Sequence, residues 1–253
     1  MSAPILRIDA LGKTFVAGGA PVPALDGVCL DVAPGEIVAL VGTSGCGKST
    51  LLNVLAGFET PSAGRVLLDG SPIDGPGADR GVVFQSDNLF GWLTVRRNVE
   101  FPLRLAVNRA ARAALAARVD ELIGLVGLSE FRDAYPKELS GGMRQRAAIA
   151  RALVSRPRIL LMDEPFGALD AQTRESMQML LLDVAAASRA TILFVTHDVE
   201  EAVFLGDRVV VMKARPGRIV YERKVDFARP RAPVVKVDPA FTQIRREILE
   251  NVH

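Results

Sequence analysis

The chain has 253 residues, 49% of them hydrophobic, which suits one α/β domain or a core domain with an inserted subdomain. Its 31 lysine and arginine residues nearly balance 29 aspartate and glutamate residues, so the overall charge argues against nucleic acid as a partner. The two cysteines, Cys29 and Cys46, are too few for a disulfide framework or a metal cluster and favour a reduced compartment.

The first ten residues carry neither a basic region nor a long apolar region, so we predict no signal peptide. No apolar run reaches the roughly 18–20 residues that a membrane-spanning helix needs. A role at a membrane would therefore require docking onto another chain that crosses it.

The first third of the chain alternates strands with glycine- and proline-rich turns. We predict strands at 6–8, 28–32, 36–41, 65–68 and 81–84. The segment 18–23, rich in Gly and Pro, is expected to connect the first two strands. The strand 36–41 is almost wholly apolar, as in a sheet covered on both faces, and a helix is expected at 48–57.

From residue 86 to 157 the pattern changes to helical spacing. Helices are expected at 107–126 and from Ser140 to about Ser155, where Pro157 follows. Strands return at 158–162, 191–195 and 208–212, with helices at 171–187 and 199–204 and a short one near 239–249. We predict a core of residues 1–85 and 158–225, a helical subdomain at 86–157 and a tail at 226–253.

A phosphate-binding loop is predicted between the strand 36–41 and the helix that follows it. The sequence GTSGCGKS, from Gly42 to Ser49, fits the pattern G-x-x-x-x-G-K-[ST]. Its glycines let successive N–H groups face a phosphate, Lys48 would bridge the β- and γ-phosphates, and Ser49 would offer its hydroxyl to Mg²⁺. The nucleotide-binding residues expected here are Gly42, Thr43, Ser44, Gly45, Cys46, Gly47, Lys48, Ser49 and Thr50.

Cys46 supports a separate hypothesis. Its thiol would lie beside Lys48 at the start of a helix, a setting that favours the thiolate. We expect maleimide modification of Cys46 to block nucleotide binding and Mg-ATP to protect it. The alternative is a small residue that the loop merely tolerates.

Two acidic residues follow the apolar strand at 158–162. Open α/β sheets place ligands at the carboxyl ends of their strands, where Asp163 and Glu164 lie. Asp163 is expected to hold Mg²⁺, and Glu164 to act as the general base on the attacking water.

A second glycine-rich segment, LSGGMRQR at Leu139–Arg146, precedes that strand by one helix. With the phosphate loop and the Asp-Glu pair, it resembles the signature motif of the ATP-binding subunits of ABC transporters. The resemblance covers nearly the whole chain to about residue 225. It implies a P-loop NTPase core of the RecA-like type, a helical insertion and an N-terminal antiparallel β region.

The resemblance also implies roles for residues that the patterns alone do not assign. Phe15 is similar to the aromatic residue that stacks on adenine, and Gln85 to the glutamine that meets Mg²⁺ and the attacking water. His197 is similar to the switch histidine that contacts the γ-phosphate. The remaining counterparts are Ser140, Gly141 and Gly142, which would bind ATP held by a second copy, and the D-loop residue Asp170.

Two positions depart from the family's commonest pattern. Met143 stands where the signature usually has Gln, and Gly167 where the D-loop often has Ser. Since Ser140, Gly141 and Gly142 are intact, contact with the γ-phosphate is expected to survive, and the Met affects only the ribose side.

Finer similarities point to the importer branch for taurine, nitrate and sulfonates, with GPGADRGVVFQ at Gly75–Gln85 most like taurine importers. The resemblance implies an ATPase at the cytoplasmic face of the inner membrane, paired with a second copy of itself. It would contact a permease through Gln85–Trp92 and serve a periplasmic solute-binding protein indirectly. Packing of Trp92 inside the helical region is the alternative for that segment.

Other activities stay open at this point. The same kind of ATP site would be found in an importer for nitrate or another small anion. It would also be found in a soluble ABC-type ATPase of DNA repair or translation. The chain has neither the long coiled-coil insertion nor the second cassette of the soluble types. It also lacks the Asn-Lys-x-Asp motif of a GTPase, and a metabolic kinase would not need the LSGG segment that the chain contains.

Overall fold

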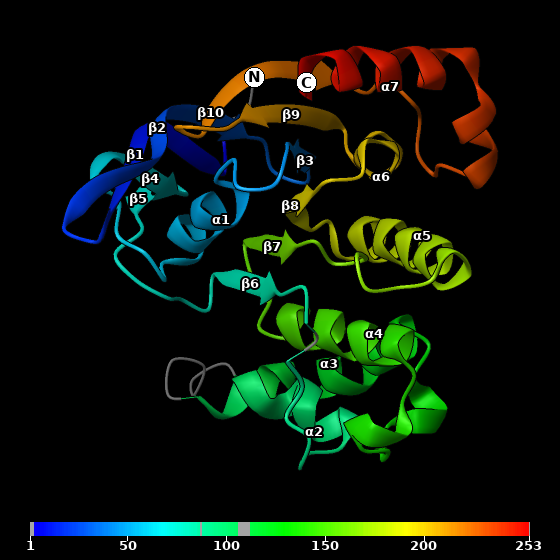
Figure 1. The fold of residues 1–253 in the computed structure, drawn as a ribbon. Helices are drawn as coiled ribbons and strands as arrows, with labels where there is room; N and C mark the ends of the chain where they lie inside the picture. The colour runs from blue at the N-terminus through cyan, green and yellow to red at the C-terminus, as the bar shows by residue number, and fades with distance from the viewer. Residues whose placement is uncertain (1–2, 87, 106–111, 253) are drawn as a thin grey trace. The chain divides into compact units, whose positions relative to one another are not determined.

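The computed structural model describes residues 3–86, 88–105 and 112–252. The chain forms two compact units, the first made of Met1–Pro76 and Thr191–His253 and the second of Gly77–Ala190. Figure 1 shows the first unit in blue at one end of the chain and in yellow to red at the other.

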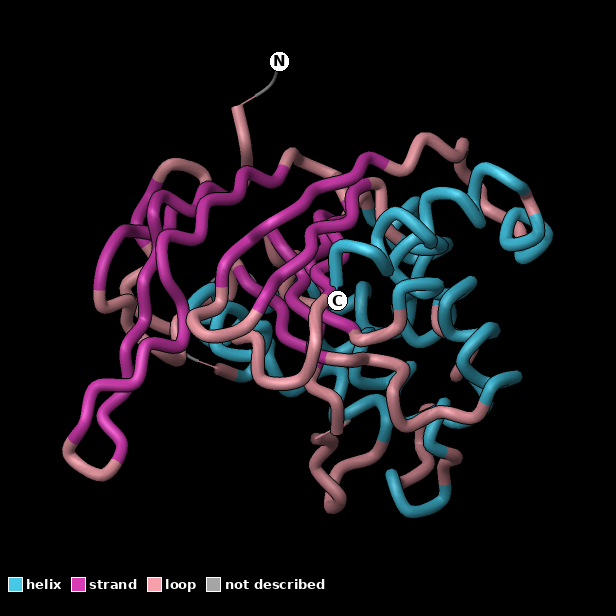
Figure 2. The backbone as a smooth tube through the Cα atoms, turned by 45° about the horizontal axis from the view of Figure 1, so that its top comes forward, coloured by secondary structure: helices cyan, strands magenta, loops and turns pink. Residues whose placement is uncertain are grey.

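An antiparallel sheet opens the first unit. It contains, in the spatial order β2-β1-β4-β5, the strands β2 (Ala20–Val32), β1 (Leu6–Ala17), β4 (Ala63–Leu68) and β5 (Ser71–Pro72). Strands β1 and β2 form one long hairpin that turns at Gly18 and Gly19, both with positive φ (Figure 2). The prediction of a connection at 18–23 was wrong, because Pro21 and Pro23 belong to β2. They are tolerated there since β2 is an edge strand of this sheet.

Parallel strands form the centre of the first unit. Strand β3 (Ile37–Val41) pairs in parallel with β8 (Thr191–Thr196) and with β9 (Arg208–Lys213), and β10 (Arg218–Lys224) adds antiparallel to β9. Every residue of β3 and β8 is buried, which explains the apolar sequences. Helix α1 (Lys48–Ala56) follows β3 and ends at Gly57, as predicted. Strand β10 was not predicted from the sequence.

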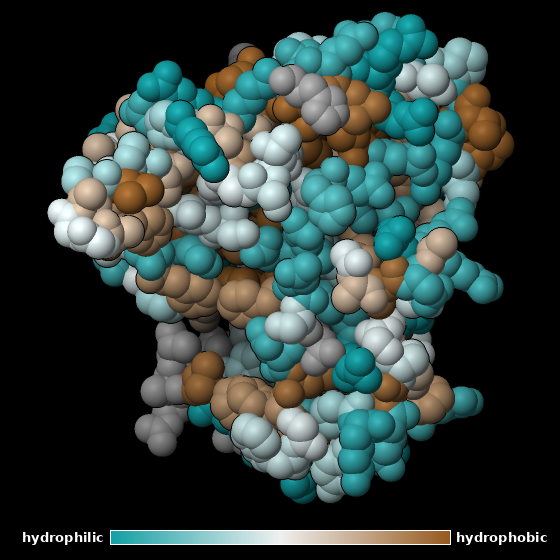
Figure 3. Space-filling model, in the orientation of Figure 1, coloured by the Kyte–Doolittle hydropathy of each residue, from teal (hydrophilic) through white to brown (hydrophobic). Residues whose placement is uncertain are grey.

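The C-terminal part of the first unit is helical. Helix α6 (Val199–Leu205) follows β8, and a 3₁₀ helix (Pro233–Val237) leads into α7 (Pro239–Val252). Helix α7 is amphipathic: it buries Phe241, Ile244 and Ile248, whereas its outer surface is mostly hydrophilic (Figure 3). The helix of the tail is therefore longer than the one predicted near 239–249, and a 3₁₀ helix precedes it.

The second unit combines two strands with several helices. Strands β6 (Arg80–Val83) and β7 (Ile159–Asp163) are parallel, with Val82 opposite Leu161. The helices are α2 (Val95–Glu100), α3 (Arg112–Leu125), α4 (Gly141–Leu153) and α5 (Ala171–Ser188), with 3₁₀ turns at Phe101–Arg104, Ser129–Phe131 and Pro136–Glu138. The predicted start of a helix at 107–111 lies outside the described residues.

The predicted α/β class with an N-terminal antiparallel β region is confirmed. The described part of 86–157 contains helices and no strand, while the domain boundaries themselves stay a prediction. Within the part of the chain that the structure describes, no helix is both long enough and apolar enough to cross a membrane.

Candidate functional site

The loop between β3 and α1 has a backbone that only small residues allow. Gly45 and Gly47 have φ of 77° and 94°, in the left-handed region. A Cβ at Gly42 would lie 2.4 Å from the carbonyl oxygen of Met212, and one at Gly47 would lie 2.8 Å from Leu25 Cδ2. The glycines therefore set a tight curl at the start of α1.

Helix α1 begins differently from its neighbours. Its N-cap is Gly47, and no side chain accepts a hydrogen bond from its first turn. Side chains do cap other helices: Thr94 caps α2, Ser140 caps α4, Asp170 caps α5, Asp198 caps α6 and Asp238 accepts from the first turn of α7. Helix α1 thus begins without the side-chain cap that these other helices have, and the helix dipole favours an anion there.

Lys48 is held at this loop by the loop's own carbonyls. Its side chain is buried, and Nζ donates to the carbonyl oxygens of Gly42 at 2.7 Å and Thr43 at 3.2 Å. Ser49, the next residue, is exposed. A buried, fixed ammonium and an exposed serine are therefore neighbours at the start of α1.

The structure supports one half of the Cys46 hypothesis and weakens the other. Cys46 Sγ lies 3.8 Å from Lys48 Nζ, which is the predicted neighbour. However, Cys46 is only 1% exposed and its sulfur faces Gly42, where a Cβ would lie 2.6 Å from Sγ. Labelling therefore requires an opening of the loop, and the thiol is mainly a packing group.

Two further predicted site residues lie in the first unit. Phe15 is on β1 opposite Val22, 37% exposed, with Lys13 Nζ 4.9 Å from its ring centroid. His197 is exposed and follows the last residue of β8. Beside it, Thr196 Oγ1 accepts from the N–H of Asp198 at 3.0 Å. Both residues are therefore exposed at the surface of this unit.

In the second unit, Glu164 follows β7 in an unusual backbone conformation. Its φ is 41°, which costs a non-glycine residue of order 1–3 kcal/mol and is typical of functional sites. A turn closes behind it, in which Gly167 N–H donates to the carbonyl of Glu164 at 3.1 Å. Buried Pro165 and Phe166 fix the turn in place. The strained backbone and the turn behind it thus fix the position of Glu164, whose carboxylate is the predicted general base.

Gln85 and Glu164 meet at Gly167. A Cβ built on Gly167 would lie 3.5 Å from Glu164 Oε2 and 3.8 Å from Gln85 Nε2. Gln85 follows β6, and Asp163 is the last residue of β7, the strand paired with it. The structure therefore brings together three of the predicted catalytic and metal-binding residues at one sheet edge.

The signature segment lies against the D-loop of the same chain. Ser140 caps α4 by accepting from Met143 N–H at 3.3 Å, at the start of the helix that the sequence predicts. A Cβ at Gly142 would lie 2.5 Å from Thr173 Cγ2, and one at Gly141 would lie 3.9 Å from Leu169 Cδ2. Because Thr173 and Leu169 flank Asp170, the second glycine allows the two segments to pack closely.

Asp170 caps α5 by accepting from Thr173 N–H at 3.0 Å. This backbone bond, together with the Thr173 side chain, lowers the pKa of Asp170 below its ordinary value. Arg174 holds the preceding loop by donating to the carbonyls of Phe166 and Leu169 at 3.4 and 2.7 Å. Arg174 was not predicted from the sequence, although its place four residues after Asp170, on the same helix face, was a usable signal.

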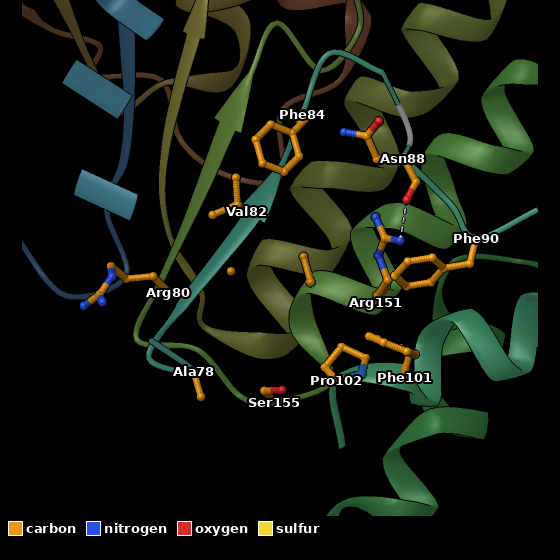
Figure 4. Close-up of a pocket in the computed structure, with 12 residues that line it drawn as sticks. Ala78, Arg80, Val82, Phe84, Asn88, Phe90, Phe101, Pro102, Arg151 and Ser155 are labelled. Carbon is orange, nitrogen blue, oxygen red and sulfur yellow. Dashed lines mark hydrogen bonds between the residues drawn. The ribbon is translucent and has the colours of Figure 1, made fainter. Parts of the chain in front are cut away.

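A groove of about 430 Å³ lies in the second unit, near the segment that follows Gln85 (Figure 4). Aromatic rings of Phe84, Phe90 and Phe101 line it together with Arg151. Arg151 donates to the carbonyl of Asn88 at 2.7 Å. Trp92 lies beside Phe90, with ring centroids 5.3 Å apart, and is 74% exposed. Packing of Trp92 inside the helical region, the alternative considered from sequence, is therefore excluded.

Asn98 shapes this segment and was not singled out as a structural residue from sequence. It is fully buried, and its side chain bonds to Phe90 N–H, to the carbonyl of Phe90 and to the carbonyls of Leu93 and Thr94. A buried amide with all its hydrogen bonds made holds an otherwise irregular loop.

Comparison with known proteins decides the family. The ABC transporter family model matches residues 25–167, which include the loop at 42–49 and the Asp-Glu pair at 163–164. The chain belongs to the ABC transporter family. As such it is an ATPase that serves transport, as the resemblance predicted.

Similar proteins extend the match along the chain. A taurine import ATP-binding protein of Burkholderia pseudomallei is 53% identical over 235 residues, which are 90% of this chain and 89% of that protein. One of Rhizobium johnstonii is 50% identical over 256 residues, 98% of this chain and 97% of that protein. An uncharacterised ABC transporter ATP-binding protein of Methanocaldococcus jannaschii is 49% identical, with 96% and 90% covered.

Solved structures agree on the fold. The dimeric ATP-binding cassette MJ0796 bound to ADP and Pi has a TM-score of 0.73 at 34% identity, covering 88% of this chain and 100% of that one. The cbiO1 protein of Clostridium perfringens, part of the transporter complex cbiONQ, has a TM-score of 0.78 at 27% identity, covering 100% and 98%. The predicted P-loop NTPase fold is confirmed.

Proposed function

We propose that this chain is the ATP-hydrolysing subunit of an importer for taurine or a related sulfonate. The observation that supports this choice of solute is sequence identity to taurine import ATP-binding proteins. It amounts to 50–53% and covers 89–97% of the length of those proteins. Nitrate and other small anions, and a soluble role apart from transport, have no comparable support.

The loop at 42–50 is the ATP phosphate site in this proposal. The start of α1, which has no side-chain cap, offers N–H donors, and the left-handed φ of Gly45 and Gly47 allows the tight curl of the loop around a phosphate. Lys48, already aligned on the loop carbonyls, neutralises the β- and γ-phosphates. Phe15 provides an exposed ring for adenine.

The chemistry of the donors fits Mg²⁺. Among the described residues there is no cluster of three or more His, Cys, Asp or Glu side chains. Mg²⁺ suits such a setting, since it keeps several waters and uses one or two carboxylates with substrate phosphates. Ser49, Asp163 and Gln85 would hold it through oxygen atoms, and the ion would neutralise charge on the phosphates.

Glu164 and His197 carry out hydrolysis in this account. Glu164 accepts a proton from the attacking water, and Gln85, next to it at Gly167, orients that water. His197 donates a hydrogen bond to the γ-phosphate. The turn behind Glu164 and the left-handed φ hold the carboxylate ready before ATP arrives.

The signature segment serves ATP bound by a second copy of the chain. Ser140, Gly141 and the start of α4 form an exposed helix N-terminus, and Asp170 lies next to them through Thr173. The dimeric cassette bound to ADP and Pi supports this pairing. Two copies would thus share two ATP sites, each with the phosphate loop of one and the signature of the other.

The groove at Phe90 is the proposed contact for a membrane permease, at the cytoplasmic face of the inner membrane. An exposed tryptophan next to an aromatic groove is typical of an interface anchor. Since the groove follows Gln85 along the chain, movement there can reach the water-orienting side chain. A periplasmic solute-binding protein would act only through the permease.

Deleting the gene tests the solute. We expect the deletion strain to lose uptake of radiolabelled taurine and to regain it with the wild-type gene. Glu164→Gln should not restore uptake, although the purified variant should still bind ATP, because the amide cannot accept the proton. Undiminished taurine uptake in the deletion strain, with loss of nitrate uptake instead, would overturn the assignment.

A further inference from the structure

The C-terminal segment from Val225 to Val252 contacts the short helix α6 at both the first and the last turn of that helix. Helix α6 packs against the 3₁₀ helix at Pro233–Val237 and against α7. Figure 1 shows this orange-to-red segment passing around the yellow helix. None of the proposed roles in ATP hydrolysis involves these contacts.

The first turn of α6 is held by two cations from the tail. Glu200 pairs with Lys236 at 3.4 Å and with Arg245 at 3.2 Å. Lys236 Nζ also lies 4.7 Å from the ring centroid of Phe204, on the same helix. The negative charge of Glu200 suits a helix N-terminus, so the pairs hold a residue that already stabilises α6.

The last turn of α6 is held by a buried arginine. Arg231 is 2% exposed and donates to the carbonyls of Val203, Phe204 and Gly206 at 3.4, 3.0 and 2.7 Å. It also donates to the carbonyls of Val225 and Phe227. A cation at these carbonyls satisfies the helix C-terminus and complements its dipole.

Arg231 stays charged at neutral pH. Burial lowers its pKa to about 10, and Arg229 adds to this effect while Asp207 opposes it. Asp207 pairs with Arg229 at 2.9 Å and accepts from Ile37 N–H at 2.9 Å, at the start of β3. The buried cation therefore connects the tail, the end of α6 and the strand that leads to the phosphate loop.

His197 lies immediately before α6 and depends on where the helix begins. Asp198 caps the helix by accepting from the N–H groups of Glu200 and Glu201 at 2.9 and 3.2 Å. Thr196, at the end of buried β8, accepts from Asp198 N–H. His197 is therefore confined between a rigid strand and the first turn of α6, so a displacement of the helix changes where its imidazole points.

We propose that the C-terminal segment is a clamp that positions His197, with Arg231 and Glu200 as its positioning residues. The clamp fixes α6 at both ends and thereby keeps the imidazole in the orientation that meets the γ-phosphate. This inference rests on the proposed role of His197 in hydrolysis.

The chain offers a direct probe, because it has only two histidines, His197 and His253. In a full-length His253→Gln background with isotope-labelled histidine, the single imidazole NMR signal reports on His197. The test variants are Glu200→Gln, which loses the exposed pairs, and Arg231→Lys, which keeps the charge but loses the five-carbonyl geometry. The matched control is Arg223→Gln, which breaks the β10–α7 pair with Glu247 (2.9 Å) without touching α6.

We expect the His197 signal to shift or broaden in Glu200→Gln and Arg231→Lys and to stay in place in Arg223→Gln. Turnover of ATP should fall about tenfold with KM changed less than about twofold, since a small misplacement of a catalytic group affects the chemical step most. An unmoved signal in both test variants, or a moved signal with unchanged kcat, would overturn the clamp.

The imidazole signal also separates this inference from the proposed function. If His197→Ala hydrolyses ATP at the wild-type rate, the role of His197 in hydrolysis is wrong. The signal then still decides whether the tail sets the histidine's position, because it is measured without turnover.

Discussion

At the scale of single residues, Gly167 controls the space around the proposed catalytic pair. It is exposed and its φ lies outside the left-handed region, so alanine fits its backbone. The added methyl would make ordinary contacts with Glu164 Oε2 at 3.5 Å and Gln85 Nε2 at 3.8 Å. The glycine therefore keeps open the place where water would lie between the carboxylate and the amide.

We predict that Gly167→Ala lowers kcat for ATP hydrolysis while leaving stability within about 0.5 kcal/mol of wild type. The methyl crowds the water site and not the ATP phosphates, so KM should change little. Gly75→Ala is the control, because a Cβ there has no atom within 4 Å. Steady-state kinetics and urea unfolding measure both effects, and an equal kcat in the two variants would contradict the role of this space.

The two cysteines give a second test at this scale. Cys29 is exposed, whereas Cys46 is buried against the phosphate loop. We predict that maleimide labels Cys29 quickly and Cys46 slowly in the native protein, and that Mg-ATP slows Cys46 further by holding the loop closed. Mass spectrometry of digested protein compares the two rates in one sample. Equal rates would mean that the loop opens freely.

At the scale of elements, the caps distinguish one helix start from the rest. Ser140 and Asp170 satisfy the first turns of α4 and α5, while α1 is left without a side-chain cap for a phosphate. The packing of Gly142 on Thr173 joins α4 and α5, so the signature and the D-loop respond together to a partner's ATP.

The Asp170 cap predicts a dependence of stability on pH. Because the folded pKa is lowered, the carboxylate's contribution is fully present above the unfolded value of about 3.9 and is lost as pH falls through the folded pKa. Asp170→Asn keeps an oxygen acceptor but no charge. We expect its unfolding free energy to depend less on pH between about 2 and 5 than that of wild type, measured by urea titration. Parallel pH profiles would refute the charged cap.

Some elements could be predicted from the sequence because they have local sequence signals, whereas others have none. The wholly apolar β3, the apolar centre of β8 and the glycine before Lys48 have local signals, so their positions were predicted correctly. The strands β1 and β2 are longer than predicted, because Pro21 and Pro23 usually end strands but are tolerated at a sheet edge. The role of Arg231 at α6 has no local signal, since the carbonyls of Val203, Phe204 and Gly206 lie 28, 27 and 25 residues away in the sequence.

At the scale of the whole molecule, the account makes each chain incomplete by itself. The phosphate loop and His197 belong to one compact unit, and Gln85, Glu164 and the signature belong to the other. In the proposed dimer, Lys48 of one copy and Ser140 of the other act on the same ATP. The central claim is therefore that hydrolysis needs two copies with complementary halves.

Mixing two inactive variants tests this claim most directly. Lys48→Ala removes the phosphate contact and Ser140→Tyr blocks the signature surface, and each alone should lack ATPase activity. After equal amounts are mixed and allowed to exchange, half of the dimers carry one intact site of two, so we predict recovery of about a quarter of wild-type activity. The double variant Lys48→Ala/Ser140→Tyr, treated in the same way by itself, should remain inactive. No recovery in a mixture in which mixed dimers are shown to form would contradict the shared site.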